Sequence, residues 1–223
     1  MTLFSALKTA VATDLRDPSN VTFSAGTVAD LINAALTEVG RIAPERFQED
    51  LTVVAGQLAY PLRSSVFGVP VPEIEVKMVE VWSKATTPHR FLGRLNAASA
   101  GYSRSSIDGW MVWGGVLTLT NVIVDWLDPA KHVIRVWGYS PYLKLTTDSQ
   151  VLTVSNELEQ AMRVYCRIEA LQRLVFDRDL FSQWQSIAGN TDVTLAGLMN
   201  SLSLAQADWR RRERQLFVPR EPA

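Results

Sequence analysis

The sequence predicts an α+β fold in which helices and strands occupy separate stretches of the chain. Apolar residues with helical spacing mark residues 1–48 and return in residues 146–217, before a short tail at residues 218–223. Short apolar runs typical of strands fill residues 49–145. A run of strands enclosed by runs of helices indicates segregated layers. We therefore expect one domain: a helical body that carries a central antiparallel β-rich insertion.

Composition favours a folded protein without a membrane partner. The chain has 223 residues, of which 47% are hydrophobic and seven are tryptophan, so it has ample material for a packed core. Its 22 basic and 23 acidic residues nearly cancel, so no strong overall field draws it to nucleic acid or to an anionic membrane. No apolar run approaches the roughly 20 residues of a membrane span. The single cysteine, Cys166, excludes an internal disulfide and fits a reducing cytoplasm.

Two helices are predicted at the start of the chain. Apolar residues at steps of four predict the first helix, which ends near Asp14. These residues are Leu3, Leu7, Val11 and Leu15. The second helix begins after Ser24 and stops between Gly40 and Pro44, which are helix-ending residues. Its apolar residues with helical spacing are Val28, Leu31, Ile32, Ala35, Leu36 and Val39.

The insertion is predicted to contain about five to seven strands. Its clearest strand, residues 74–82, changes the phase of its apolar residues, as a β-bulge would. Gly114 and Gly115 separate two apolar runs, residues 110–113 and 116–120, and predict a hairpin with a two-residue turn. The other predicted strands are residues 51–54, 60–62, 121–126 and 132–137. One helical turn is expected at residues 92–98 and a crossing loop at residues 138–154.

The C-terminal helices form the frame of the predicted fold. Ser155 and Asn156 are N-cap candidates, and Glu159 completes a capping-box pattern after Asn156. The helix that follows is expected to break at residues 189–190. A second helix then carries a narrow apolar stripe, which suits antiparallel packing along the first. The stripe consists of Leu195, Leu198, Leu202, Ala205 and Trp209.

Few residues qualify for catalysis or metal binding. The two histidines, His89 and His132, do not lie at metal-ligand spacing from each other or from Cys166. Cys166 lies on an apolar helix face with no activating neighbour, so a small core residue explains it better than a nucleophile does. A solvated helix face explains Asp177 and Asp179 better than a carboxylate site does. The sequence therefore predicts no enzymatic activity, no catalytic site, no metal and no cofactor.

Arginines cluster over residues 210–214, directly after Trp209 at the end of the last predicted helix. A solvated helix end and a contact with an acidic partner or phosphates explain this cluster about equally well. Phe217 and Val218 favour the partner contact, because exposed apolar side chains need cover. The β-rich region also holds more tryptophans than a small sheet needs, so some are expected at interfaces. They are Trp82, Trp110, Trp113, Trp126 and Trp137.

Five stretches match the pattern of one known family, in order along the chain. They are residues 23–44, 52–62, 75–81, 137–143 and 159–161. The second is the most specific, because it reads Thr-Val-Val-Ala-Gly-Gln-Leu-Ala-Tyr-Pro-Leu. With these stretches the chain resembles the head–tail adaptor, or connector, proteins of tailed bacteriophages. Residues 83–109 match nothing in that family.

The resemblance implies a structural virion protein without enzymatic activity. It implies a dodecameric ring beneath the portal, at the neck of the virion, which extends the DNA channel and gives the tail a docking platform. The implied partners are the portal protein, neighbouring copies of the chain, and a stopper or tail protein. Double-stranded DNA would pass through the ring without specific contacts, including during genome ejection. Such a protein would be made in the host cytoplasm.

On this resemblance, two surfaces are expected to meet partners. The C-terminal arm is expected to dock on the portal through Trp209, Arg210, Arg211, Arg212, Arg214, Phe217 and Val218. The insertion is expected to face neighbouring subunits or the tail through Trp110, Trp113 and Trp126.

Two alternatives stay open. A tail-side structural protein, such as a tail terminator or a tubular tail component, shares the composition. Helices at both ends of the chain favour the adaptor, because tail-tube proteins are dominated by β-structure. A small enzyme or ligand-binding domain is disfavoured by the scarcity of histidine, cysteine and clustered carboxylates, and a ligand-induced rise in melting temperature would support it.

Overall fold

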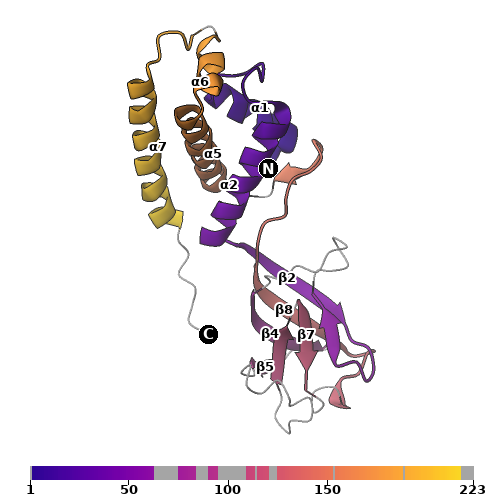
Figure 1. Ribbon diagram of the computed structural model, residues 1–223. Helices are drawn as coiled ribbons and strands as arrows, with labels where there is room; N and C mark the ends of the chain where they lie inside the picture. The colour runs from indigo at the N-terminus through magenta and orange to yellow at the C-terminus, as the bar shows by residue number, and fades with distance from the viewer. Residues whose placement is uncertain are drawn as a thin grey trace. The chain divides into compact units, whose positions relative to one another are not determined.

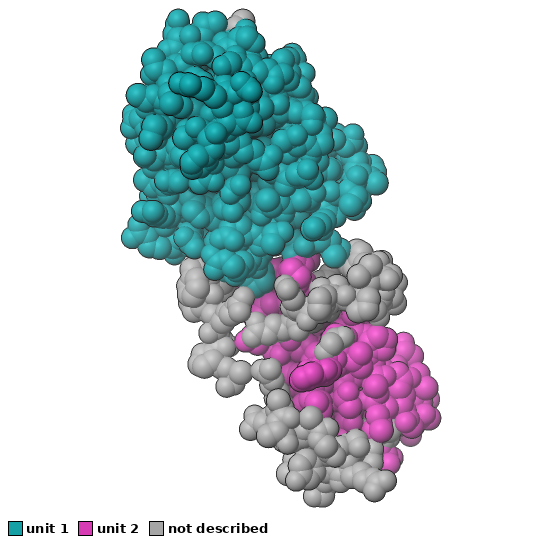
Figure 2. Space-filling model, viewed as in Figure 1, with its two compact units in different colours: residues 1–44, 142–221 teal, residues 45–141, 222–223 magenta. Residues whose placement is uncertain are grey.

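The computed structural model describes residues 2–62, 75–83, 90–94, 109–113, 115–120, 125–152, 154–187 and 189–216. These residues have an α+β fold, as predicted, with helices and antiparallel sheets in separate parts of the chain (Figure 1). They fall into two compact units, one within residues 1–44 and 142–221 and the other within residues 45–141 (Figure 2). We call them the helical unit and the sheet unit.

The helical unit contains all the long helices that the structure describes. They are α1 (Phe4–Asp14), α2 (Ala25–Ile42), α5 (Asn156–Phe176), α6 (Arg178–Gln185) and α7 (Leu195–Leu216). Two short strands, β1 (Thr2–Leu3) and β9 (Val151–Leu152), pair antiparallel beside them. The predicted ends of α1 and α2 are confirmed. Ser24 caps α2, since its hydroxyl oxygen accepts a hydrogen bond from the Thr27 amide at 3.1 Å.

The loop between α1 and α2 is held by a buried carboxylate. Asp17 is 1% exposed and accepts hydrogen bonds from the amides of Val21, Thr22 and Phe23 at 2.8, 2.9 and 2.7 Å. Three donors to one carboxylate fix the backbone of this loop. The Phe23 ring is thereby carried into the core of the helical unit.

The start and end of α5 differ from the prediction. Ser155 is the N-cap and accepts a hydrogen bond from the Leu158 amide at 3.3 Å. Glu159 does not complete a capping box, because its carboxylate accepts a hydrogen bond from the Thr2 hydroxyl at 2.6 Å. The helix ends at Phe176, well before residue 189, because Asp177 starts a new helix. The Asp177 carboxylate accepts hydrogen bonds from the Asp179 and Leu180 amides, both at 3.0 Å, so it caps α6 and is more than a solvated charge.

Helices α5 and α7 form the expected antiparallel hairpin (Figure 1). The apolar stripe of α7 faces α5, with Leu198, Ala205 and Trp209 buried. The Trp209 ring packs edge-on against the Tyr165 ring of α5, with centroids 5.0 Å apart. Leu195, at the start of the stripe, is 45% exposed and lies outside this buried row.

The sheet unit is built on a sheet of seven described strands in the order β2-β8-β4-β5-β6-β7-β3. Neighbouring strands run antiparallel, except for β5 and β6, which run parallel. The strands are β2 (Glu45–Thr52), β3 (Ala59–Pro61), β4 (Glu75–Ser83), β5 (Arg90–Arg94), β6 (Gly109–Trp113), β7 (Val116–Leu119) and β8 (His132–Ser140). Their apolar side chains form a core of their own that includes Val79, Ile134 and Trp110.

Two local predictions for the sheet are confirmed. The register of β4 against β8 shifts between Val76 and Met78, at a β-bulge. Strands β6 and β7 form the hairpin, with Trp113 opposite Val116. Gly115 has φ 77°, a left-handed conformation that glycine adopts without a steric penalty.

Other local predictions for the sheet are wrong. The residues 92–94 continue β5 and do not form a helical turn. Asp125 and Trp126 are helical, whereas a strand was expected there. Strand β8 continues to Ser140 and β2 begins at Glu45, because these ends pair with each other across the sheet. Phe47 is the only apolar residue in the added part of β2, residues 45–50, so the sequence pattern does not reveal the strand there.

Candidate interaction surfaces

The basic residues of the C-terminal arm divide into two groups on α7. Asp208 accepts hydrogen bonds from Arg211 at 2.6 Å and from Arg212 at 3.0 Å. These residues lie three and four positions apart, which brings them together on a helix surface. The Arg212 guanidinium, followed by that of Arg211, holds the pKa of Asp208 below its ordinary value. The positive charge of Arg211 and Arg212 is thus balanced in part by Asp208 within the same helix.

Arg210 and Arg214 form the second group. A spacing of four residues places one above the other on the helix surface, and both are exposed. The Arg214 Nε donates a hydrogen bond to the Arg210 carbonyl at 3.1 Å. Neither forms an ion pair with a carboxylate of the described residues. This side of the arm carries the positive charge available to a partner.

An ion-pair chain ties the basic end of α7 to α2. The Arg41 Nη2 lies 2.7 Å from Glu38 and 3.4 Å from Glu213 of α7. The hydrogen bond that Arg41 donates to the Glu38 carboxylate contributes most to raising the pKa of Arg41. Because Arg41 is well exposed, these ion pairs add little stability. They do show that the end of α7 lies beside α2.

Two tryptophans assigned to interfaces belong to cores. Trp209 is 8% exposed and packs between α5 and α7, so its side chain offers little surface to a portal. Trp110 is 1% exposed within the sheet core and cannot contact a partner without disrupting that core. Both assignments are corrected: these residues position surfaces and do not form them.

The other residues that were expected at partner interfaces differ in their exposure and contacts. Trp113, in β6, is 77% exposed and presents most of its indole to solvent. Trp126 is partly buried and packs edge-on against His132, with ring centroids 5.4 Å apart. Phe217 and Val218 lie outside the described residues.

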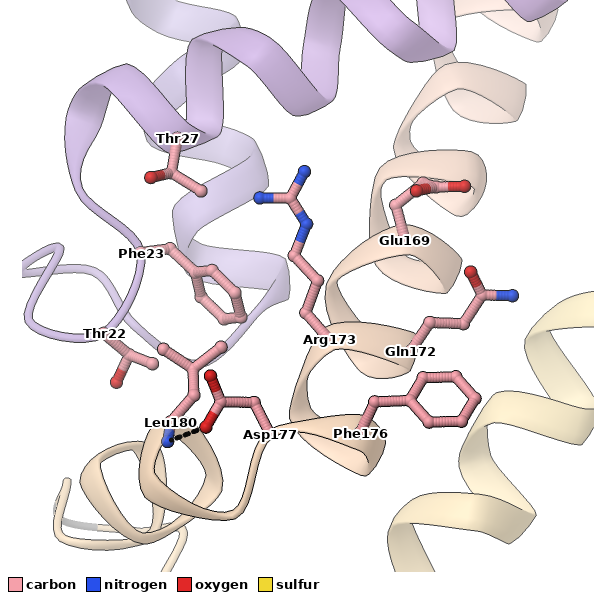
Figure 3. A pocket seen from close by; sticks show the side chains of 9 residues that line it. All are labelled: Thr22, Phe23, Thr27, Glu169, Gln172, Arg173, Phe176, Asp177 and Leu180. Carbon is pink, nitrogen blue, oxygen red and sulfur yellow. Dashed lines mark hydrogen bonds between the residues drawn. The ribbon is translucent and has the colours of Figure 1, made fainter.

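A hollow that the sequence did not reveal lies on the helical unit. It has a volume of about 600 Å³ and is bordered by the start of α2, the last turns of α5, and α6 (Figure 3). Phe23 lies behind its wall and is buried, Leu180 supplies apolar surface, and Arg173 and Asp177 supply charge. Phe176 borders the hollow and is 86% exposed, more than any other described large hydrophobic residue. Figure 3 shows Phe176 projecting toward the side on which α7 lies.

Cys166 and His132, which were weighed for catalysis and metal binding, have structural roles. Cys166 is buried, and this burial raises the pKa of its thiol to about 12. His132 Nδ1 accepts a hydrogen bond from the Asp128 amide at 3.0 Å and so belongs to a turn. His89 lies outside the described residues. Across the described part of the chain, histidine, cysteine and carboxylate side chains form no cluster of three that could hold a metal ion.

The raised pKa of Cys166 gives a direct prediction. We expect the thiol to resist a disulfide exchange reagent at pH 8 in the native protein, because only the exposed thiolate reacts. Unfolding in denaturant should restore reaction of one thiol per chain, measured by absorbance of the released chromophore. Rapid stoichiometric labelling without denaturant would contradict the buried position of Cys166.

No helix among the described residues combines the length and apolar character required to cross a membrane. No model of a known protein family matches the chain, and no curated protein matches it either.

Proposed function

We propose that the protein is a head–tail adaptor of a tailed bacteriophage, located at the neck of the virion. In this role it forms a ring beneath the portal, extends the DNA channel and provides the platform on which the tail docks. Its partners are the portal protein, neighbouring copies of itself, and a stopper or tail protein. The observation that carries the proposal is the course of α7, which continues as a helix through the arginine cluster to Leu216.

The geometry of α7 suits a docking arm. Its apolar stripe is fixed against α5, so the exposed arginines are held on a rigid helix and need little ordering on binding. Arg210 and Arg214 project from one side without a carboxylate partner among the described residues. Guanidinium groups pair strongly with carboxylates, so the matching portal surface is expected to be acidic.

The near-neutral chain also suits a channel through which DNA must move. Formal net charge is −1, so the protein has no overall positive field that would hold the phosphate backbone. Contacts with passing DNA would then be weak and independent of sequence. Compensation of Arg211 and Arg212 by Asp208 reduces the local attraction further.

Co-sedimentation with tail-less, DNA-filled heads that carry a portal tests the proposal. Wild-type protein should bind stoichiometrically at one vertex. The double variant Arg210→Glu/Arg214→Glu should bind at least about tenfold more weakly at physiological salt, because it sets like charges against an acidic surface.

A matched control separates this contact from a general charge effect. Arg167→Glu/Arg178→Glu makes the same change in net charge at exposed positions of α5 and α6 and should bind as the wild type does. Equal weakening by both double variants would refute a specific basic contact on α7. Binding to purified tails in preference to heads would replace the adaptor proposal with the tail-side alternative.

A further inference from the structure

The hollow beside Phe176 lies at the end of α5 on the helical unit. Helices α2 and α7 both pack against α5 and are joined at one end by the Arg41–Glu213 ion pair. Their other ends lie farther apart (Figure 1). Helical spacing puts Leu195 and Met199 on the same side of α7 as Glu213. They are 45% and 53% exposed and Phe176 is 86% exposed, so these three apolar side chains lack cover in the described residues.

The chemistry of the hollow fits a short segment with apolar residues and mixed charge. Leu180 and Phe176 provide apolar contacts for an aromatic or aliphatic side chain. Glu169 and Arg173 add one charge of each sign. An occupant with apolar residues at one end and an adjacent pair of opposite charges would satisfy both parts.

Residues 217–222 have this composition. They read Phe-Val-Pro-Arg-Glu-Pro, with Phe217 and Val218 followed by the charged pair Arg220 and Glu221. Prolines bias such a segment toward an extended, polyproline-like conformation, which lowers the entropy lost on binding. The segment therefore carries both the apolar and the charged side chains that the hollow can accept.

The segment cannot reach the hollow of its own chain. Helix α7 has 22 residues and is about 33 Å long at 1.5 Å per residue. In the antiparallel hairpin, the end of α5 at Phe176 lies beside the start of α7, near Leu198. Phe217 follows the last residue of α7, Leu216, and extends at most about 3.6 Å beyond it. A hollow filled by Phe217 must therefore belong to a second copy.

We infer that Phe217 and Val218 of one copy bind in the hollow beside Phe176 of a second copy, in place of the portal contact expected for them from the sequence. The donor segment and the acceptor hollow are different surfaces, so the contact is heterologous and can repeat around a closed ring. The inference rests on the proposed function only in taking a ring as the product. Portal docking remains with Arg210 and Arg214.

A mixing experiment with full-length chains tests the contact. Wild-type protein should self-associate in analytical ultracentrifugation, with a mass that rises with concentration. Phe176→Ser removes the acceptor, Phe217→Ser removes the donor, and each variant alone should remain monomeric. An equimolar mixture should form a 1:1 dimer and nothing larger, because the intact hollow of one variant accepts the intact segment of the other.

The mixture also guards against a folding defect, since complementation requires both variants to be folded. Leu204→Ser is the matched control: Leu204 is 65% exposed on α7 but is turned away from Met199, so this variant should associate as the wild type does. The inference is overturned if wild-type protein stays monomeric, if Phe176→Ser associates normally, or if the mixture gives no dimer.

The result is independent of portal binding. Arg210→Glu/Arg214→Glu leaves hollow and segment intact and should still self-associate, even where it no longer binds heads. If Phe217→Ser instead weakened head binding while self-association stayed unchanged, the segment would belong to the portal contact and the inference would fail.

Discussion

Alanine in place of Trp110 will lower the free energy of unfolding of the sheet unit by about 3–5 kcal/mol. The indole is 1% exposed and is the largest fully buried side chain of the described residues. It lies in β6 within the same core as Leu117 and Leu119 of β7. Removing it leaves a cavity that neighbours held in a hydrogen-bonded sheet cannot fill. Urea unfolding followed by far-ultraviolet circular dichroism should show an earlier transition for this unit alone, because the two units have separate cores.

Trp113 provides the control for this prediction. It lies in the same strand but is 77% exposed, so Trp113→Ala should change the free energy of unfolding by no more than about 0.5 kcal/mol. Similar losses for the two variants would show that burial does not distinguish them. Trp113 thus remains the tryptophan of β6 whose loss can alter a contact without altering the fold.

Alanine in place of Trp209 will lower the free energy of unfolding of the helical unit by about 3–5 kcal/mol. The ring is 8% exposed and joins the C-terminal half of α7 to α5. Its edge-on contact with Tyr165, at 5.0 Å between centroids, adds to the area that it buries. The change should move the transition of the helical unit and leave that of the sheet unit in place.

Trp209→Phe tests whether this residue acts through packing. Phenylalanine keeps an aromatic ring against Tyr165, so this variant should retain most of the stability and normal binding to heads. Loss of head binding by Trp209→Ala with an unchanged unfolding curve would instead make Trp209 a direct portal contact.

Features set by neighbouring residues were predictable from the sequence. The Ser24 cap, the ends of α1 and α2, the bulge in β4 and the β6–β7 hairpin each depend on a few adjacent side chains. Features set by distant partners were not. Glu159 is bound by Thr2, 157 positions away, and the first residues of β2 are held by the last residues of β8.

For the candidate interaction surfaces too, local features were predictable from the sequence and features that join distant residues were not. The arginine cluster was visible, and its division by Asp208 follows from helical spacing. The hollow was not visible, because it joins Phe23 to residues 169–180, which lie far apart in the sequence. Trp110 and Trp113 could not be told apart either, since their burial depends on strands that pair with β6 from both sides.

The insertion of the sheet between α2 and α5 has a consequence for biosynthesis. Glu45 and Ser140, at the two ends of the insertion, are opposite each other in paired strands, so the sheet unit can close on itself as soon as β8 has been made. The apolar face of α2 must wait for α5, roughly 110 residues later, a delay of about 5–20 s at 5–20 residues per second. Near the end of that interval the nascent chain carries a finished sheet behind an uncovered amphipathic helix. Recognition by holding chaperones, and aggregation of stalled chains, should therefore be concentrated on residues 25–42.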